Sequence, residues 1–478
     1  MPGKYIIGVD GGSQSSKVVI FDLEGTVVCQ GRQALRPMSR PRYGIVEHPD
    51  DDLWDSIAAA SRQAMAKFNG DPQDIVAVGL CTIRCERAFL KEDGSLASPV
   101  MSWMDTRAYQ PYVQENPETA YVTTSSGYLA HRFTGRFRDT AANNIAAQWP
   151  IDTDTWQWSE DPAIFEHWNI PREMLFDLQM PGDIAGYVTR EAATATGLPA
   201  GLPVVATAND KAVEALGSGA LDETTALISL GTYISAMVHG HENRKAPVDF
   251  WTNFACIPHK YLYESHGIRR GMWTLTWFLD LLGEEFADAA AAAGMSRELY
   301  LEREAEKVAP GSDGLMTVLD WLAPDDKPFR KGVMIGFDAR HTRGHVCRSI
   351  LEAIALTMKN YVDAMCEELD ISLEAIVISG GGAGSDLFMR VFADAFEIPS
   401  SRSVASGGAS LGAAICAAVA TGVYPDFETA VALMTKPRES FAPDAATSAI
   451  YRRMNETVYQ TISTATDDLL ERSYPIFH

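Results

Sequence analysis

The feature that most restricts the fold is a strand–turn–strand pattern that occurs twice, far apart in the chain. Short runs rich in β-branched residues at 5–9 and 17–21 flank the polar segment DGGSQSS. Apolar runs at 225–230 and 233–238 flank a Gly-Thr dipeptide in the same way. Runs of this kind, bounded by glycine and polar residues, are typical of β-strands. Two such turns can grip one polyphosphate from two sides, because glycine lets backbone amides approach an anion closely.

The length and charge of the chain limit the kinds of protein that it can be. Its 478 residues exceed one typical domain and predict two large ones. A formal net charge of −23 repels nucleic acid and anionic lipid, so neither is expected as a partner. No signal-peptide pattern is found, and no window reaches the roughly 20 apolar residues that span a bilayer. We expect a cytoplasmic protein, and a homodimer is one assembly that the sequence leaves open.

The order of the predicted elements indicates an α/β protein. Apolar runs of strand length are interspersed with longer stretches in which apolar residues recur at helical spacing. The clearest strands are expected at 75–80, 203–206 and 375–379, and the clearest helices at 51–68, 211–219, 350–365, 386–396 and 409–420.

The domain boundary is predicted from one polar stretch near the middle of the chain. Residues 240–250 are charged and contain proline, which is typical of exposed connections between domains. This division gives an N-terminal domain at 1–247, which includes both glycine turns described above, and a C-terminal domain at 248–478.

The first glycine turn carries residues suited to holding phosphate and a metal ion. Gly12 and Ser13 can offer backbone and hydroxyl donors, and Lys17 can add a positive charge. Asp10, at the end of the preceding strand, can hold Mg²⁺ directly or through water. The alternative interpretation of the same residues is an ordinary glycine-rich hairpin.

A third glycine-rich segment lies between a predicted strand and a predicted helix. Gly381, Gly382 and Ala383 have almost no side chain, so a flat ring or a ribose could lie on their backbone. The segment matches neither of the common phosphate-loop patterns. A tight strand-to-helix turn without a ligand is therefore the alternative.

Asp210 is the strongest candidate for a catalytic acid or base. It follows a predicted strand and opens a predicted helix in the order Asn209, Asp210, Lys211. A carboxylate in this place faces a cleft rather than the interior of a sheet. The alternative is a helix N-cap, since aspartate is a favoured cap residue.

Two short segments between the first strands and Asp210 have the composition of a polyol pocket. Trp103 and Asp105, together with Arg84 upstream, could stack on and hydrogen-bond to a sugar-like molecule. The alternative is a buried tryptophan beside a surface ion pair.

These segments, in this order and spacing, resemble the FGGY carbohydrate kinases over nearly the whole chain. The resemblance is carried by GVDGGSQSSKVVIFD, EHPDDDLW, SWMDTR, NDKAVEALGSG, SLGTY, ISGGGAGSDLFMRVFADAF and SLGAAICAAVATGVYP. It implies two actin-like (ribonuclease H-like) α/β ATPase domains that flank a deep cleft. It also implies an ATP- and Mg²⁺-dependent transfer of phosphate to a small carbohydrate of one of three classes, a ketose, a polyol or a sugar acid.

The resemblance assigns roles to individual residues. Asp210 corresponds to the base that receives the proton of the substrate hydroxyl. Asp10 and Asp210 correspond to the carboxylates expected near the bound Mg²⁺ ion. The expected ATP-binding residues are Gly12, Ser13, Lys17, Gly231, Thr232, Gly381, Gly382 and Ala383. The expected substrate-binding residues are Arg84, Cys85, Trp103, Asp105, Asn209 and Lys211.

Departures from the family pattern bear on the substrate. Many relatives carry glutamine and then histidine or glutamate near the sugar, where this chain has Ile83 and Cys85. After the base, relatives often carry glutamine or asparagine rather than Lys211. Arg84 and Lys211 could make the pocket basic and suit an anionic polyol. In the alternative, Lys211 pairs with Glu214 along the helix and does not meet substrate.

Two other functions fit parts of the pattern. An actin- or Hsp70-like ATPase would share the core, but it has no use for SWMDTR or the Asn-Asp-Lys turn. A nucleotide-binding regulatory protein without catalysis would not need both Asp10 and Asp210.

Overall fold

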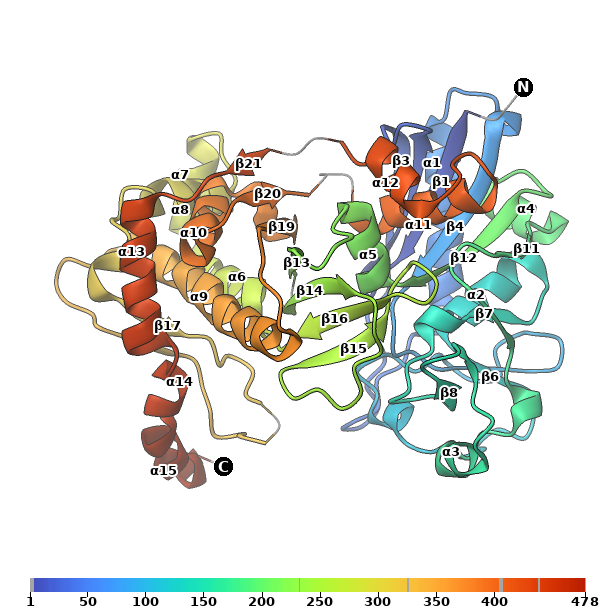
Figure 1. The fold of residues 1–478 in the computed structure, drawn as a ribbon, viewed down its shortest axis with the longest axis horizontal. Helices are drawn as coiled ribbons and strands as arrows, with labels where there is room; N and C mark the ends of the chain where they lie inside the picture. Colours follow the sequence, from blue (N-terminus) through green and yellow to red (C-terminus); the bar gives the residue numbers. More distant parts are fainter. Residues whose placement is uncertain (1–3, 232, 325, 404–406, 437–438, 478) are drawn as a thin grey trace.

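Two large β-sheets, each covered by helices, make up the protein (Figure 1). The computed structural model describes residues 4–231, 233–324, 326–403, 407–436 and 439–477. The first sheet has the strand order β11-β12-β4-β1-β2-β3, and the second has the order β15-β16-β14-β13-β19-β20-β21. The predicted α/β class is confirmed.

The elements of the first sheet and its surroundings come mostly from the N-terminal half. Its strands are β1 (Tyr5–Gly11), β2 (Ser15–Asp22), β3 (Val27–Ala34), β4 (Ile75–Thr82), β11 (Ile184–Tyr187) and β12 (Pro203–Asn209). The helices are α1 (Asp52–Lys67), α2 (Ser125–Thr134), α3 (Pro162–Trp168), α4 (Arg190–Thr196) and α5 (Asp210–Ser218). Shorter strands are β5 (Ala88–Leu90), β6 (Tyr121–Thr123), β7 (Arg138–Thr140), β8 (Ile151–Asp152), β9 (Gln157–Trp158) and β10 (Asp177–Gln179).

The second sheet comes from the remainder of the chain. Its strands are β13 (Thr225–Leu230), β14 (Ile234–Gly240), β15 (Phe250–Phe254), β16 (Tyr261–Ser265), β19 (Ala375–Gly380), β20 (Ser400–Arg402) and β21 (Ser440–Phe441). A small separate pair is β17 (Met316–Val318) and β18 (Val333–Ile335). The helices are α6 (Gly271–Leu281), α7 (Gly283–Ala292), α8 (Arg297–Ala305), α9 (Arg343–Leu369), α10 (Asp386–Phe396), α11 (Gly408–Ala420), α12 (Phe427–Met434), α13 (Ala445–Met454), α14 (Ile462–Ala465) and α15 (Asp467–Phe477).

The chain passes from the first sheet to the second earlier than the sequence predicted. β13 pairs with β19 and β14, so the strands on both sides of Gly231 belong to the second sheet. The predicted boundary at 247/248 had placed this turn in the N-terminal domain. The polar stretch instead connects β14 to β15 within the second sheet, and its Lys245 forms an exposed ion pair with Asp154 at 2.6 Å. We propose that the domains divide between α5 and β13.

Helix α11 returns from the C-terminal part of the chain to the first sheet. Figure 1 shows it beside the blue strands β1 and β4. A Cβ added at Gly8 would lie 1.8 Å from the backbone oxygen of Ser410, and one at Gly79 would lie 1.9 Å from that of Ala413. The two glycines therefore allow the helix and the sheet to meet backbone against backbone.

The interior of the first sheet is apolar on both faces. Ile6, Ile7 and Val9 of the central strand β1 are fully buried, and α1 contributes the buried residues Leu53 and Ile57 from its amphipathic face. Among the described residues, no helix combines the length and the apolar composition that crossing a bilayer requires.

Candidate active site

The second and third glycine segments begin side by side. β13 and β19 are parallel neighbours, with Ser229 opposite Ser379 and Leu230 opposite Gly380. Because parallel strands end at the same edge of a sheet, Gly231 and the segment from Gly381 onward leave that edge together. Thr232, the other residue proposed for the second turn, lies outside the described residues.

The first glycine turn lies close to the start of α5. Asp10 is the penultimate residue of β1 and the cross-strand partner of Lys17 on β2. The Asp10 carboxyl is near enough to Asp210 and Glu214 for both to affect its pKa. A groove of about 550 Å³ runs beside the turn, and Asp10, Ser15, Lys17 and Arg32 are among the residues that line it. The turn therefore has room for an anionic ligand on this side.

Asp210 is the first residue of α5 but does not cap it. Asn209 is the N-cap, and its side-chain oxygen accepts a hydrogen bond from the Ala212 amide at 3.1 Å. Asn209 also donates to the backbone oxygen of Ala142 at 3.2 Å, so its side chain is engaged within the fold. One carboxylate oxygen of Asp210, Oδ1, is buried and has no hydrogen-bond partner among the described residues. The side chain is thus available for a ligand.

Burial changes the acidity of both aspartates. It raises the pKa of Asp210 above its usual range, and Glu214 adds to this, whereas the Arg84 and Lys211 cations oppose it. Burial also raises the pKa of Asp10 to about 7, with further contributions from the nearby Asp210 and Glu214 carboxylates. Perturbed carboxylates grouped in this way are typical of functional sites.

The raised pKa of Asp10 predicts a pH-dependent effect of removing its carboxylate. An acid that binds its proton more tightly in the folded state contributes less to the free energy of unfolding as the pH rises, here from about 4 to about 7. Without nucleotide or metal, Asp10→Asn should be more stable than the wild type at pH 8 and keep only a smaller part of that advantage at pH 5. Urea titrations at both pH values check this, and an equal difference at both would contradict it.

Arg84 follows β4 and reaches across to the second sheet. Its Nη1 and Nη2 donate to the two carboxylate oxygens of Glu264 at 2.6 and 2.9 Å. Glu264 is fully buried on β16 and also accepts hydrogen bonds from Ser235 and Asn253 at 2.9 and 3.1 Å. The guanidinium charge is therefore compensated by a carboxylate with four donors.

Lys211 is also engaged. Its Nζ donates to Ser229 Oγ at 2.8 Å and lies 3.8 Å from Glu214 Oε2. This is the arrangement of the alternative in which Lys211 pairs with Glu214. The two cations that had suggested a basic pocket thus both have carboxylate partners.

The proposed polyol residues are not all brought together. Trp103 is 42% exposed. Cys85, next to Arg84, has a left-handed backbone with φ of 65°. Asp105 differs from the expectation, because it is fully buried and its oxygens accept hydrogen bonds from the Val46 amide at 2.9 Å and from Arg107 at 2.8 and 3.0 Å. Its carboxylate supports the loop rather than facing a ligand.

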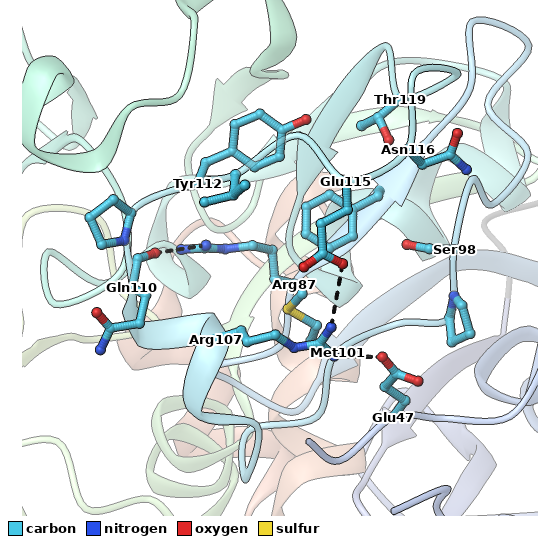
Figure 2. Close-up of a pocket in the computed structure, with 14 residues that line it drawn as sticks. Glu47, Arg87, Ser98, Met101, Arg107, Gln110, Tyr112, Glu115, Asn116 and Thr119 are labelled. Carbon is cyan, nitrogen blue, oxygen red and sulfur yellow. Dashed lines mark hydrogen bonds and ion pairs between the residues drawn. The ribbon is translucent and has the colours of Figure 1, made fainter. Parts of the chain in front are cut away.

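A separate small cavity lies behind this loop (Figure 2). It has a volume of about 140 Å³, and Arg87, Met101 and Tyr112 are among its lining residues. Figure 2 shows Arg107 on its wall, paired with Glu47 and Glu115. None of the proposed site residues that the structure describes lines it, so this cavity is not part of the candidate active site.

Sequence reasoning missed Glu264 and gave Glu214 only a minor part. The signal for Glu264 was a carboxylate inside the otherwise apolar strand YLYES. A charged residue at a buried position requires a partner, but the sequence does not say which one.

Comparison with known proteins identifies the family. The model for the N-terminal domain of the FGGY family of carbohydrate kinases matches residues 5–116 and 110–217, and the model for the C-terminal domain matches 226–421. An uncharacterized sugar kinase of Escherichia coli K12, YgcE, is 50% identical over 478 residues, which cover 100% of this chain and 97% of the relative. A glycerol kinase of Alkaliphilus oremlandii is 23% identical, with 88% of this chain and 90% of the relative covered.

Solved structures agree on the fold. The xylulose kinase of Rhodospirillum rubrum superimposes with a TM-score of 0.82 at 22% identity, covering 98% of this chain and 100% of the other. The gluconate kinase of Lactobacillus acidophilus gives a TM-score of 0.81 at 18% identity, covering 97% and 98%. The chain therefore belongs to the FGGY family of carbohydrate kinases, enzymes that use ATP as the phosphate donor.

Proposed function

We propose that this kinase transfers the γ-phosphate of ATP to a hydroxyl group of a neutral polyol or ketose, with Asp210 as the catalytic base. The observation that carries the proposal is the buried, unpartnered Oδ1 of Asp210 at the start of α5. A sugar hydroxyl is a poor nucleophile at neutral pH and must lose its proton as the new bond to phosphorus forms. A carboxylate within hydrogen-bond reach accepts that proton and contributes about 10²–10⁴-fold to the rate.

The charges around Asp210 favour a neutral substrate. Arg84 is held by Glu264, and Lys211 lies beside Glu214 and Ser229. A substrate carboxylate would have to compete with Glu264 or Glu214 for these cations. An additional anion would also approach the carboxylates of Asp10 and Asp210, which repel it.

Mg²⁺ is part of the proposal, and the residues present fit it. No group of three or more His, Cys, Asp or Glu side chains in the described ranges is placed to hold a metal. Mg²⁺ is commonly held by one or two carboxylates together with substrate phosphates, and Asp10 and Asp210 offer such oxygens. When bound, the ion would neutralise charge on the transferred phosphoryl group.

A substrate panel tests the proposed function. ADP release is measured with ATP, Mg²⁺ and matched pairs of neutral polyols or ketoses and the corresponding sugar acids, with gluconate included because one structural neighbour is a gluconate kinase. We expect turnover on one or more neutral compounds. Turnover confined to the acids would overturn the neutral-substrate proposal, and ADP release independent of any added compound would overturn the kinase assignment.

Enlarging Gly381 should weaken nucleotide binding without unfolding the protein. A Cβ added at Gly381 meets no atom within 4 Å, so the space that it enters is open. If adenosine lies there, Gly381→Leu fills its place, and we expect the Kd for ATP to rise about tenfold or more, the effect of about 1.4 kcal/mol. Calorimetric titration measures the Kd. An unchanged affinity would contradict the assignment of this segment to adenosine.

A further inference from the structure

Glu214 connects the helix that carries Asp210 to the edge of the second sheet. It lies four residues after Asp210 on α5, so the two side chains share one face of the helix. Glu214 Oε1 accepts a hydrogen bond from Ser379 Oγ at 2.6 Å, and Oε2 accepts one from Ser229 Oγ at 3.0 Å. A single carboxylate thus binds two strands at once.

The two serines occupy matched positions at the start of the glycine segments. Ser229 and Ser379 are register partners on β13 and β19, and each is followed within two residues by glycine. Lys211 Nζ donates to Ser229 Oγ at 2.8 Å and so orients that hydroxyl toward Glu214. The network therefore fixes both strand ends relative to the first turn of α5.

The position of this network matters for the reaction. Phosphoryl transfer depends mainly on the placement of the attacking hydroxyl and the phosphate, since the protein contributes little covalent chemistry. Asp210 belongs to a helix that follows the first sheet, whereas Gly231 and the 381–383 segment belong to the second sheet. A contact across this division can hold the base in register with the nucleotide segments of the second sheet.

We propose that Glu214 is a positioning residue, which sets the distance between Asp210 and the nucleotide by tying α5 to Ser229 and Ser379. This inference rests on the function proposed above. Glu214 itself need not touch either substrate. Its contribution is the pair of hydrogen bonds, so a side chain of equal length that keeps both should preserve it.

The test is a double-mutant cycle in the full-length enzyme with Glu214→Ala, Ser379→Ala and the combined variant. Misplacement by about 1 Å can reduce a rate about 10²-fold, and we expect a loss of this order in kcat for Glu214→Ala. The KM for ATP should change little, because the contacts proposed for ATP at Gly231 and at 381–383 are to the backbone. Adding Ser379→Ala to Glu214→Ala should cause little further loss of kcat, since the hydrogen bond between the two side chains is already absent. Glu214→Gln should restore most of kcat.

A second readout needs no substrate. In Glu214→Ala, hydrogen exchange of the 379–384 backbone amides should be faster than in the wild type, while exchange in α9 stays the same. The control is Ser312→Ala, which removes a similar hydrogen bond, at 2.7 Å to Glu352 on α9, and should leave kcat unchanged.

The outcomes separate this inference from the proposed function. Unchanged exchange in 379–384, additive losses in the cycle, or no rescue by Glu214→Gln would overturn the positioning role. Faster exchange together with no phosphorylation of any compound in the panel would support the contact of Glu214 with the two strands. It would, however, contradict the proposed function.

Discussion

Replacing Asp210 with asparagine is expected to lower kcat by about 10²–10⁴-fold while leaving ATP binding nearly intact. Asparagine has the same shape but cannot accept the proton that the substrate hydroxyl must lose. The ATP-binding segments around Gly231 and Gly381 lie on the second sheet and should not depend on this side chain. Steady-state ADP release gives kcat, and calorimetry gives the affinity for ATP.

The control for this substitution is Asp222→Asn. Asp222 is an exposed carboxylate in the connection between α5 and β13. Its replacement by asparagine should therefore leave kcat unchanged. If Asp210→Asn kept nearly the wild-type kcat on the true substrate, Asp210 would not be the base. If it lost ATP binding as well, a structural role would explain the loss better.

The second large effect is expected from Gly79→Ala in β4. The added Cβ would lie 1.9 Å from the backbone oxygen of Ala413 and 2.4 Å from its carbonyl carbon, so helix α11 would have to move away from the sheet. Overpacking of this kind costs about 3 kcal/mol of unfolding free energy. Chemical denaturation followed by tryptophan fluorescence measures the change.

Gly381→Ala is the matched control for stability. The same methyl group enters open space there, so the denaturation midpoint should stay close to that of the wild type. An equally small effect for Gly79→Ala would show that α11 does not rest directly on β4.

Local features of the fold could be predicted from the sequence. The hairpin around the first turn, the strand before Asp210 and the helix after it follow from short-range patterns of apolar residues and glycine. The helix cap was less clear, because Asn209 and Asp210 are both favoured cap residues. In the structure Asn209 is the N-cap of α5, so the Asp210 side chain is left for other chemistry.

Features that depend on distant contacts could not be predicted. An exposed loop inside one sheet has the same polar composition as a linker, so the stretch 240–250 predicted a boundary at a place that lies within the second sheet. The alanine-rich run at 409–420 predicted a helix but not the sheet on which it packs. Arg84 and Glu264 are separated by 180 positions, and nothing in either local sequence indicates the other.

The same limit affected the proposed substrate residues. Trp103, Asp105 and Arg84 were grouped by residue type and resemblance, which do not show where a side chain points. In the structure Asp105 forms an ion pair with Arg107, and Arg84 forms one with Glu264. The pair of Arg84 with Glu264 engages one of the two cations that had suggested an anionic polyol, and it supports the neutral substrate proposed above.

In the proposed reaction, a carbohydrate hydroxyl, with its proton taken by Asp210, receives the terminal phosphate of ATP. The most direct measurement incubates the wild type and Asp210→Asn with γ-labelled ATP, Mg²⁺ and the neutral panel, and then separates organic from inorganic phosphate. We predict label in a sugar or polyol phosphate for the wild type and almost none for the variant. Label found only in inorganic phosphate, or equal labelling by both proteins, would contradict the account.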